Sequence, residues 1–403
     1  MTHASILITG AGIAGPALAY WLNRYGMKTT LVERAEELRT GGQNVDLRGG
    51  GREVARLMGL EDEVRARNTT EEGIHFVDEA GRTRASLPAT AFGGEGLVAE
   101  LEILRGELAR LLYERTRDDT EYLFGDRVAG LVERGDKVHV QFLKGPERAF
   151  DLVIAADGLR SKTRELVFAG EAEIKSFGAY VAYFTIPRLG SDGTWSRMLN
   201  APGSRSVILR PDNQGTTRAF LGFFSRERGL DRLEPAEQKA RLRRVFADVG
   251  WEAPRVLSEM ETAPDFYFDT VAQVKMPRWS RGRVALVGDA GYCPSGFTGM
   301  GTSLAMVGAY VLAGELARHA DHRAAFESYE ALLRPYVTRA QSLPPGLPRL
   351  ANPKTRAGIA IEHALLRVAT RPVISRLVGR LVSTSDKSIT LPDYSHVGHA
   401  TSA

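Results

Sequence analysis

The chain has 403 residues, of which 43% are hydrophobic and 25% charged, and its formal net charge is +4. This composition is typical of a large folded protein with two or three domains. No apolar run approaches the ~20 residues that a membrane span needs, and one cysteine, Cys293, excludes an intramolecular disulfide. The sequence predicts a cytoplasmic protein without a signal peptide. Its basic clusters have acids nearby, which predicts no nucleic-acid partner.

The first motif is a glycine-rich segment near the N-terminus. Gly10, Gly12 and Gly15 follow the apolar run 6–8 and precede an apolar helix expected over 16–25. In such a motif the first glycine permits a tight turn, the second admits backbone amides to a pyrophosphate, and the third allows close packing of helix and strand. The pattern predicts a dinucleotide site, although a glycine-rich turn in another doubly wound domain is the alternative.

An acidic residue supports the dinucleotide interpretation. A second strand, expected over 29–32, ends in Glu33. A carboxylate at this distance from the glycines can accept hydrogen bonds from both hydroxyls of an adenosine ribose. An acid here favours an unphosphorylated ribose, so the site fits FAD or NAD better than NADP.

Two further segments place a glycine and an aspartate directly after an apolar strand. Asp157 and Gly158 follow one such strand in the middle of the chain, and Gly288 and Asp289 follow another towards the end. Open α/β sheets bind their ligands at the carboxyl ends of their strands. The three segments therefore predict one composite ligand site.

The order and separations of these motifs resemble the class A flavoprotein monooxygenases. That group includes para-hydroxybenzoate hydroxylase, polyketide aromatic hydroxylases and tetracycline-inactivating enzymes, and the resemblance covers roughly the first 330 residues. It implies FAD as the cofactor and NADPH or NADH as a transient co-substrate. The residues that it assigns to FAD are Gly10, Gly12, Ala14, Gly15, Glu33, Arg34, Asp46, Arg105, Asp157, Gly288, Asp289, Gly299 and Gly301.

The segment 39–47 narrows the resemblance to the tetracycline-inactivating and polyketide hydroxylase branch. An arginine, a glycine pair and an Asp-Leu pair recur there at the same spacing. By this resemblance Asp46 approaches the flavin and Arg39 is a candidate for NADPH, with a solvated loop charge as the alternative. Arg105, in a helix expected over 102–117, would reach polar groups of FAD through its fork of donors.

The sequence also departs from the family pattern. Tyr292 stands where the family usually has a histidine, and Ser303 stands where it has an asparagine. Gly299 and Gly301 are retained ahead of an apolar helix, so backbone amides can still approach the flavin. Cys293, beside this loop, is interpreted as a small packed side chain rather than a redox group.

The expected fold class is α/β: a Rossmann-like FAD-binding domain, an inserted mostly antiparallel β-sheet for the substrate, and a C-terminal helical segment. The FAD-binding domain is assigned to 1–73, 100–176 and 277–330, the substrate domain to 74–99 and 177–276, and the helical segment to 331–403. Strands are expected over 180–186, 206–210 and 219–224. Two or three of the sheet's aromatic residues should face a ligand, the full set being Tyr180, Tyr183, Phe184, Phe220, Phe223, Phe224, Phe266, Tyr267 and Phe268.

The C-terminal region carries a second helical pattern. Apolar residues between Val373 and Leu381 recur at helical spacing, with Arg376 and Arg380 opposite. This stretch could lie on a membrane surface, but packing across the two domains is favoured because a proline interrupts it. The residues from about Asp386 onwards are polar and expected to be loose.

The resemblance implies hydroxylation of an aromatic or polycyclic, polyketide-like or antibiotic-like substrate with NAD(P)H and O2, through a C4a-hydroperoxyflavin. Such chemistry needs no catalytic side chain and no metal, because the flavin carries it. A biosynthetic role, antibiotic resistance, and a monomer or homodimer stay open. The alternatives are a flavin-dependent halogenase, whose tryptophan signature is missing around Tyr183, and a non-catalytic flavoprotein.

Overall fold

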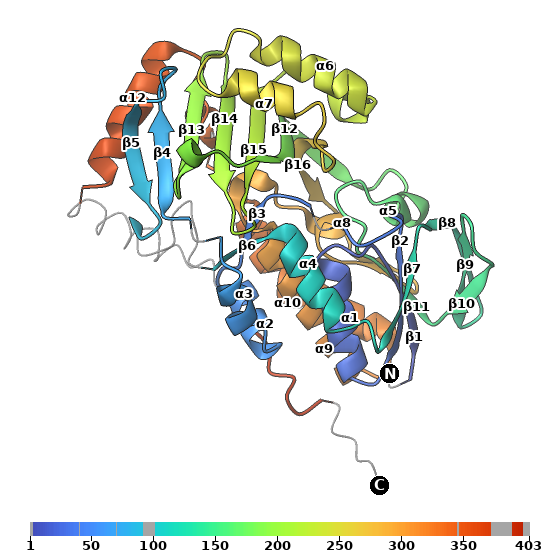
Figure 1. Ribbon diagram of the computed structural model, residues 1–403. Helices are drawn as coiled ribbons and strands as arrows, with labels where there is room; N and C mark the ends of the chain where they lie inside the picture. The colour runs from blue at the N-terminus through green and yellow to red at the C-terminus, as the bar shows by residue number, and fades with distance from the viewer. Residues whose placement is uncertain are drawn as a thin grey trace.

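The computed structural model describes residues 3–39, 41–69, 71–91, 101–344, 346–371 and 389–397. Two large sheets dominate it: helices cover the inner face of the first sheet and the outer face of the second, and a small three-stranded meander covers the outer face of the first (Figure 1). One sheet carries the glycine-bearing turns, and the other is assembled largely from the middle of the chain. The expected α/β fold class is confirmed.

The first sheet has the strand order β17-β18-β11-β1-β2-β7 and is parallel apart from β17. Its central strands are apolar and buried because helices cover one face and a three-stranded meander covers the other. The three strands that precede the motifs, β18, β11 and β1, are neighbours. The bounds are β1 Ser5–Thr9, β2 Lys28–Glu33, β7 Thr120–Phe124, β11 Leu152–Ala155, β17 Ser280–Arg281 and β18 Val284–Leu286, and the meander is β8 Val128–Arg134, β9 Lys137–Phe142 and β10 Arg148–Phe150.

Long apolar helices pack on the inner face of this sheet around α9, whose residues are almost all buried. One expected boundary was wrong: the helix expected from residue 102 begins at Arg105, because Glu102–Leu104 pairs as strand β6 with β3. The bounds are α1 Ala14–Arg24, β3 Asn44–Asp46, α2 Gly50–Leu57, α3 Glu61–Ala66, α4 Arg105–Glu114, α5 Lys162–Val167, α8 Asp289–Tyr292, α9 Gly301–Arg318 and α10 His322–Gln341.

The second sheet has the order β16-β12-β15-β14-β13-β4-β5 and is antiparallel except for the pair β13 and β4. The expected strands 180–186, 206–210 and 219–224 lie within β12, β14 and β15. Helices α6 and α7 cover its outer face (Figure 1). The bounds are β4 Gly73–Val77, β5 Thr83–Pro88, β12 Glu173–Pro187, β13 Ser196–Ala201, β14 Arg205–Pro211, β15 Thr216–Phe224, α6 Pro235–Phe246, α7 Ala253–Glu259 and β16 Tyr267–Lys275.

The C-terminal part contacts both sheets. After the short helix α11 (Leu347–Leu350), α12 (Arg356–Ala369) lies against β5 and β13. The expected boundary at 330 falls inside α10, whose buried residues belong to the core of the first sheet on both sides of that position. The amphipathic stretch between Val373 and Leu381 lies outside the described residues. Among the helices that are described, none is long and apolar enough to cross a membrane.

The expectation of a loose terminus was wrong for residues 389–397. Tyr394 is 2% exposed, and its hydroxyl donates to Oε1 of Glu315 at 2.6 Å. Its ring fills the space beside Gly314, where a Cβ would lie 2.2 Å from it. Ile389, Leu391 and Val397 also pack against the core, so apolar side chains together with Tyr394 anchor this segment.

Candidate functional site

The three glycine-bearing turns meet at the carboxyl ends of β1, β11 and β18. A Cβ on Gly10 would lie 2.8 Å from the carbonyl oxygen of Ala156, and one on Gly288 would lie 3.0 Å from the Cβ of Ala14. A Cβ on Gly15 would lie only 2.0 Å from the carbonyl oxygen of Gly10. These contacts leave no room for side chains, so the backbone itself forms the floor of the site.

The predicted ribose acid lies against the first turn. Glu33 is 5% exposed; its Oε2 accepts from the backbone amide of Ala11 at 2.8 Å and its Oε1 from that of Ala35 at 3.0 Å. The guanidinium of Arg39, about half exposed, lies 3.8 Å from Oε1 of Glu33. Arg34 is exposed at the end of β2. The structure thus brings the glycine turn and Glu33 together and adds Arg39 at their rim.

Arg105 begins α4, where its backbone amide donates to the carbonyl of Gln43 at 3.0 Å. Its Nη2 lies 3.2 Å from the position that a Cβ on Gly12 would take. Burial lowers the pKa of Arg105, and its guanidinium makes no hydrogen bond or ion pair within the described part of the chain. A shielded cation without a partner beside a glycine turn fits an anionic ligand such as a pyrophosphate.

Two carboxylates flank the turn that begins α9. Oδ2 of Asp46 lies 3.8 Å from the position of a Cβ on Gly299, and Oδ1 of Asp289 lies 3.9 Å from that of a Cβ on Gly301. Burial raises the pKa of both Asp46 and Asp289, and Arg48 counters this at Asp46 by donating from Nη2 at 2.8 Å. The arrangement places hydrogen-bond acceptors on both sides of a helix N-terminus.

The carboxylate of Asp157 accepts hydrogen bonds from residues of its own loop and of the helix that follows. Its Oδ2 accepts from the backbone amide of Thr163 at 3.1 Å and from the hydroxyl of Thr163 at 3.0 Å, while Oδ1 accepts from the hydroxyl of Ser161. The carboxylate therefore supports the first turn of the short helix α5, whose N-cap is Ser161. A contact between Asp157 and a nucleotide stays a prediction.

Arg164 was not predicted from the sequence, although it connects the Asp157 motif to the Gly288 motif. It is 1% exposed, and it donates from Nη1 to the carbonyl of Ala290 and from Nη2 to that of Leu159, both at 2.8 Å. The loop after β11 is thereby bound to the loop after β18. The only sequence feature that could have identified Arg164 is its position in the helix after Asp157. A basic residue in a short helix is more often exposed, so this feature did not predict a buried connection.

The residues that depart from the family pattern belong to the core. The hydroxyl of Tyr292 lies 2.8 Å from that of Tyr329, behind α9 and away from the turn. Cys293 is 7% exposed, burial raises the pKa of its thiol, and the predicted packed role agrees with this environment. Ser303 accepts from the backbone amide of Arg48 at 3.0 Å, which joins α9 to the segment after β3.

The aromatic residues of the second sheet divide between its two faces. On the face towards the turn 296–300 before α9, the rings of Tyr183 and Phe220 contact each other at 5.1 Å, and Phe224 stacks on Phe297 of that turn at 6.3 Å. On the outer face, a second set packs against α6 and α7 in a separate core. That set comprises Tyr180, Phe184, Phe223 and Phe268, with Phe266 packed against it.

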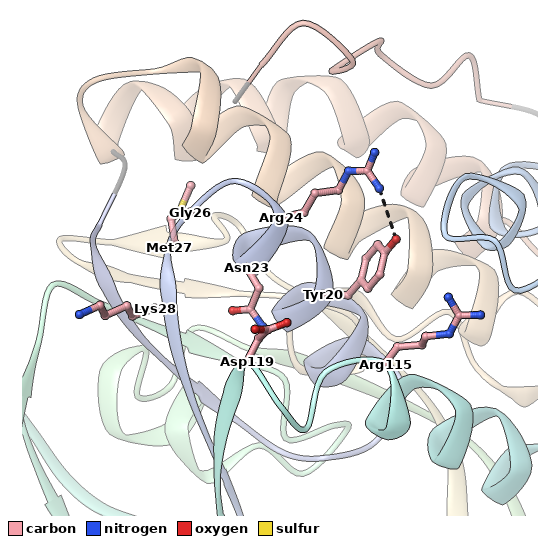
Figure 2. A pocket seen from close by; sticks show the side chains of 8 residues that line it. All are labelled: Tyr20, Asn23, Arg24, Gly26, Met27, Lys28, Arg115 and Asp119. Atoms are coloured by element: carbon pink, nitrogen blue, oxygen red, sulfur yellow. Dashed lines mark hydrogen bonds between the residues drawn. The ribbon is translucent and has the colours of Figure 1, made fainter. Parts of the chain in front are cut away.

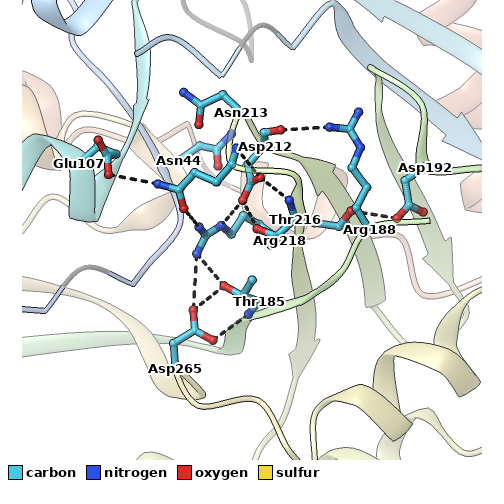
Figure 3. A network of polar contacts seen from close by, with 12 residues as sticks. Asn44, Glu107, Thr185, Arg188, Asp192, Asp212, Asn213, Thr216, Arg218 and Asp265 are labelled. Carbon is cyan, nitrogen blue, oxygen red and sulfur yellow. Dashed lines mark hydrogen bonds and ion pairs between the residues drawn. The ribbon is translucent and has the colours of Figure 1, made fainter. Parts of the chain in front are cut away.

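A polar network joins the end of the second sheet to α4, which packs with the first sheet (Figure 3). Arg218 on β15 donates from Nε to Asp212 at 2.8 Å and from Nη1 to the hydroxyl of Thr185 at 2.6 Å. From the same turn, Gln214 donates to Glu107 of α4 at 3.1 Å. A buried hydrogen bond between Arg218 and Asp212 thus orders this turn, and the exposed hydrogen bond of Gln214 joins it to α4.

A hollow of about 380 Å³ lies at the opposite end of the first sheet, around the end of α1 and the start of β2 (Figure 2). Ligands of open α/β sheets bind at the carboxyl ends of the strands, so this hollow is not the candidate site. Within the described ranges, no group of His, Cys, Asp or Glu residues could hold a metal ion. The hollow is lined by Tyr20, Asn23, Arg24, Gly26, Met27, Lys28, Arg115 and Asp119.

Together these features define the class of FAD-dependent oxidoreductases. The family model described as FAD binding domain matches residues 3–343, and the chain belongs to that family. It is a flavin-dependent monooxygenase, as its curated relatives show. A flavin-dependent monooxygenase from an unknown prokaryotic organism is 43% identical over 346 residues, covering 85% of this chain and 89% of the relative.

One further relative and two solved structures are also similar to this chain. The FAD-dependent monooxygenase asL6 of Sarocladium schorii is 36% identical over 415 residues, covering 96% of this chain and 97% of its own. The crystal structure of tetracycline destructase Tet(55) is 37% identical, covers 98% of this chain and 100% of its own, and has a TM-score of 0.81. Klebsiella pneumoniae HpxO, solved with FAD and uric acid, is 23% identical over 94% of this chain and 97% of its own, with a TM-score of 0.74, and shows the fold alone.

Proposed function

We propose that this monooxygenase uses NAD(P)H and O2 to hydroxylate a planar phenolic or polycyclic substrate. The observation that carries the proposal is the aromatic face formed by Tyr183, Phe220 and Phe224, of which Phe224 stacks on Phe297 in the turn before α9. Flat apolar walls with few polar groups suit a planar ring system. The likeness to tetracycline destructases supports a multi-ring substrate.

The residues at the turns fit FAD. Arg105 would neutralise its pyrophosphate beside Gly12, Glu33 would accept from the ribose hydroxyls, and Asp289 would accept from the ribityl chain. Bound FAD supplies the activation of dioxygen and the transfer of one oxygen atom to the substrate. The protein's own part is to orient the ring, exclude water and hold the charges in place.

A pyridine nucleotide would bind transiently at the rim of the site. The guanidinium of Arg39 is about half exposed and has only a distant contact with Glu33, so it is accessible to a phosphate group. The described residues contain one glycine-rich turn between a parallel strand and a helix of this type, after β1. A single dinucleotide fold would therefore serve FAD, while NADPH or NADH enters and leaves.

The proposal is tested by mass spectrometry of products formed under ¹⁸O₂. The panel contains an anthraquinone phenol, tetracycline and a simple phenol, each with the holoenzyme and NADPH. We expect one labelled oxygen atom in the anthraquinone or tetracycline product and faster NADPH oxidation with that compound. Peroxide as the only product from every compound would overturn the substrate class, and halide incorporation would identify a halogenase instead.

A further inference from the structure

One arginine on the inner face of the second sheet, Arg210, donates hydrogen bonds from only part of its guanidinium. Arg210 of β14 donates from Nε to Oε2 of Glu71 at 2.9 Å and from Nη2 to Oε2 of Glu102 at 2.5 Å. Its side chain remains 24% exposed, and its Nη1 has no hydrogen-bond partner in the described ranges. Two buried carboxylates therefore fix the guanidinium while one edge of it stays available.

The strand register places Arg210 on the same face as the aromatic wall. Ile208 pairs with Phe220, which pairs with Tyr183, and residues two apart on a strand share a face. Arg210 therefore lies two residues along β14 from Ile208, on the same face as Tyr183 and Phe220 and on the side towards β3 and β6. The alternate residues of β14, Val207 and Leu209, lie in the opposite core against α6 and α7.

The carboxylates around Arg210 outnumber the cations. Glu71, Glu102 of β6 and Asp46 of β3 face Arg210, with Arg48 as the second cation. Arg218, opposite Arg210 on β15, is paired with its own carboxylates, Asp212 and Asp265, and is not counted with this cluster. If all three carboxylates were ionised, two arginines would leave one uncompensated negative charge. Such an excess is costly in a buried site, and a bound proton relieves it.

Glu71 is the member of this cluster that can hold that proton. Oε1 of Glu102 accepts from Asn44 at 2.8 Å and from the hydroxyl of Thr69, whereas Oε1 of Glu71 is buried without a hydrogen-bond partner in the described part of the chain. Burial raises the pKa of Glu71 to about 7, with Arg210 opposing the shift and Glu102 and Asp46 adding to it. The charge of the cluster therefore changes near neutrality.

From this geometry we propose that Arg210 binds an anionic oxygen of the substrate, with Glu71 and Glu102 as positioning residues. The inference rests on the proposed function, because it assigns the polar contact of the same aromatic site. The ligand class is a planar polycycle that carries a phenolate, enolate or carboxylate oxygen. The free edge at Nη1 supplies a charge-assisted donor, and the neighbouring Tyr183 and Phe220 contact the rings.

The proposal has a definite pH dependence. Below a pH of about 7, Glu71 is protonated, the cluster has no excess negative charge, and an anion is attracted to Arg210. As the pH rises, Glu71 ionises, and the added charge repels the ligand. Affinity for a permanently ionised ligand should therefore fall as the pH rises through neutrality.

The experiment compares two probes of one shape on the FAD-loaded protein. Anthraquinone-2-carboxylate is ionised throughout the range, while anthraquinone-2-carboxamide carries no charge. Binding is followed by the change in flavin absorbance. We expect the carboxylate to bind about tenfold more tightly than the amide at about pH 6, and to lose up to about tenfold of its affinity by about pH 8. The amide should bind equally at both values.

Three variants test which residues cause the carboxylate preference and its pH dependence. Arg210→Met should abolish the preference for the carboxylate, and Glu71→Gln should remove the pH dependence while the preference remains. Glu362→Gln is the matched control, because burial also raises the pKa of Glu362 to about 7, but this residue lies on α12 and accepts from Asn200 at 2.8 Å. It should leave both properties unchanged.

The proposal is overturned if the wild-type protein binds both probes equally or binds neither, or if Arg210→Met keeps the carboxylate preference. A pH dependence that survives Glu71→Gln, or that disappears in Glu362→Gln, overturns the role of Glu71. FAD retention and ¹⁸O incorporation are measured on the same preparations. Loss of either in the wild-type protein would count against the proposed function, whereas a missing probe preference with both intact counts only against Arg210.

Discussion

The two sheets of this monooxygenase form their halves of the site by different means. At the first sheet the decisive contacts are with backbone atoms, as at Gly10 and Gly15, where a Cβ would lie 2.8 and 2.0 Å from a backbone carbonyl oxygen. At the second sheet the contacts are between side chains, such as the rings of Tyr183 and Phe220. A backbone site requires glycine and is visible in a sequence, whereas a side-chain site can be made in many ways.

This difference also separates the cofactor from the substrate. Backbone turns at strand ends recognise the parts of a dinucleotide that do not vary. The aromatic face, with Arg210 beside it, can change its ligand through single substitutions without disturbing those turns. The following predictions test whether the two halves are as independent as the geometry indicates.

The largest effect is expected for Gly15→Ala. The new Cβ would collide with the carbonyl oxygen of Gly10 at 2.0 Å, so α1 must move away from β1 and the turn must open. We expect a loss of about 3 kcal/mol in the free energy of unfolding and of most of the bound FAD, measured by thermal unfolding and flavin absorbance. Gly190→Ala, at a position with no atom within 4 Å of the added Cβ, should change stability by less than about 0.5 kcal/mol.

Arg105→Ala should weaken FAD binding by about ten- to a hundredfold, because a charge-assisted contact to an anion is lost. Stability of the FAD-free protein should not fall, since the guanidinium has no partner among the described residues and burial of its charge is unfavourable. Arg105→Lys, which keeps the charge without the fork of donors, should give an intermediate affinity. Equal FAD affinity in all three proteins, measured by equilibrium dialysis, would disprove the assignment.

A matched pair of substitutions separates the two faces of the second sheet. Phe223 is 4% exposed in the outer core beside Phe246, so Phe223→Leu should lower the free energy of unfolding by about 1 kcal/mol and leave the substrate preference unchanged. Phe220 contacts Tyr183 on the inner face, so Phe220→Leu should change KM or the coupling of NADPH oxidation to hydroxylation severalfold with little loss of stability. The reverse pattern would mean that the ligand does not lie on the inner face.

The sequence predicted the nucleotide-binding half in detail because its strands are continuous apolar runs that end in glycines. It did not predict strand β6, because Glu102–Leu104 continues the helical pattern of α4 and becomes a strand only by pairing with β3. The anchoring of Tyr394 was missed for a related reason, since its acceptor, Glu315, lies on a distant helix. The cluster of Arg210 draws its carboxylates from separate segments, and no spacing in the sequence connects them.

The smallest effect is expected at Arg39, on the rim between the two halves. Its guanidinium is 47% exposed and lies 3.8 Å from Glu33, so it contributes little to stability, and a phosphate group can replace the contact. Arg39→Ala should raise the NADPH concentration for half-maximal flavin reduction by about threefold to tenfold and leave bound FAD unchanged, as measured by stopped-flow absorbance. The difference from the wild-type enzyme should shrink at high salt, because exposed charges are screened. Arg115→Ala, which removes an exposed arginine near the hollow at the other end of the first sheet, should behave as wild type. If both variants reduce at the wild-type rate, Arg39 is a solvated loop charge, and the pyridine nucleotide must approach the flavin from the side of the second sheet.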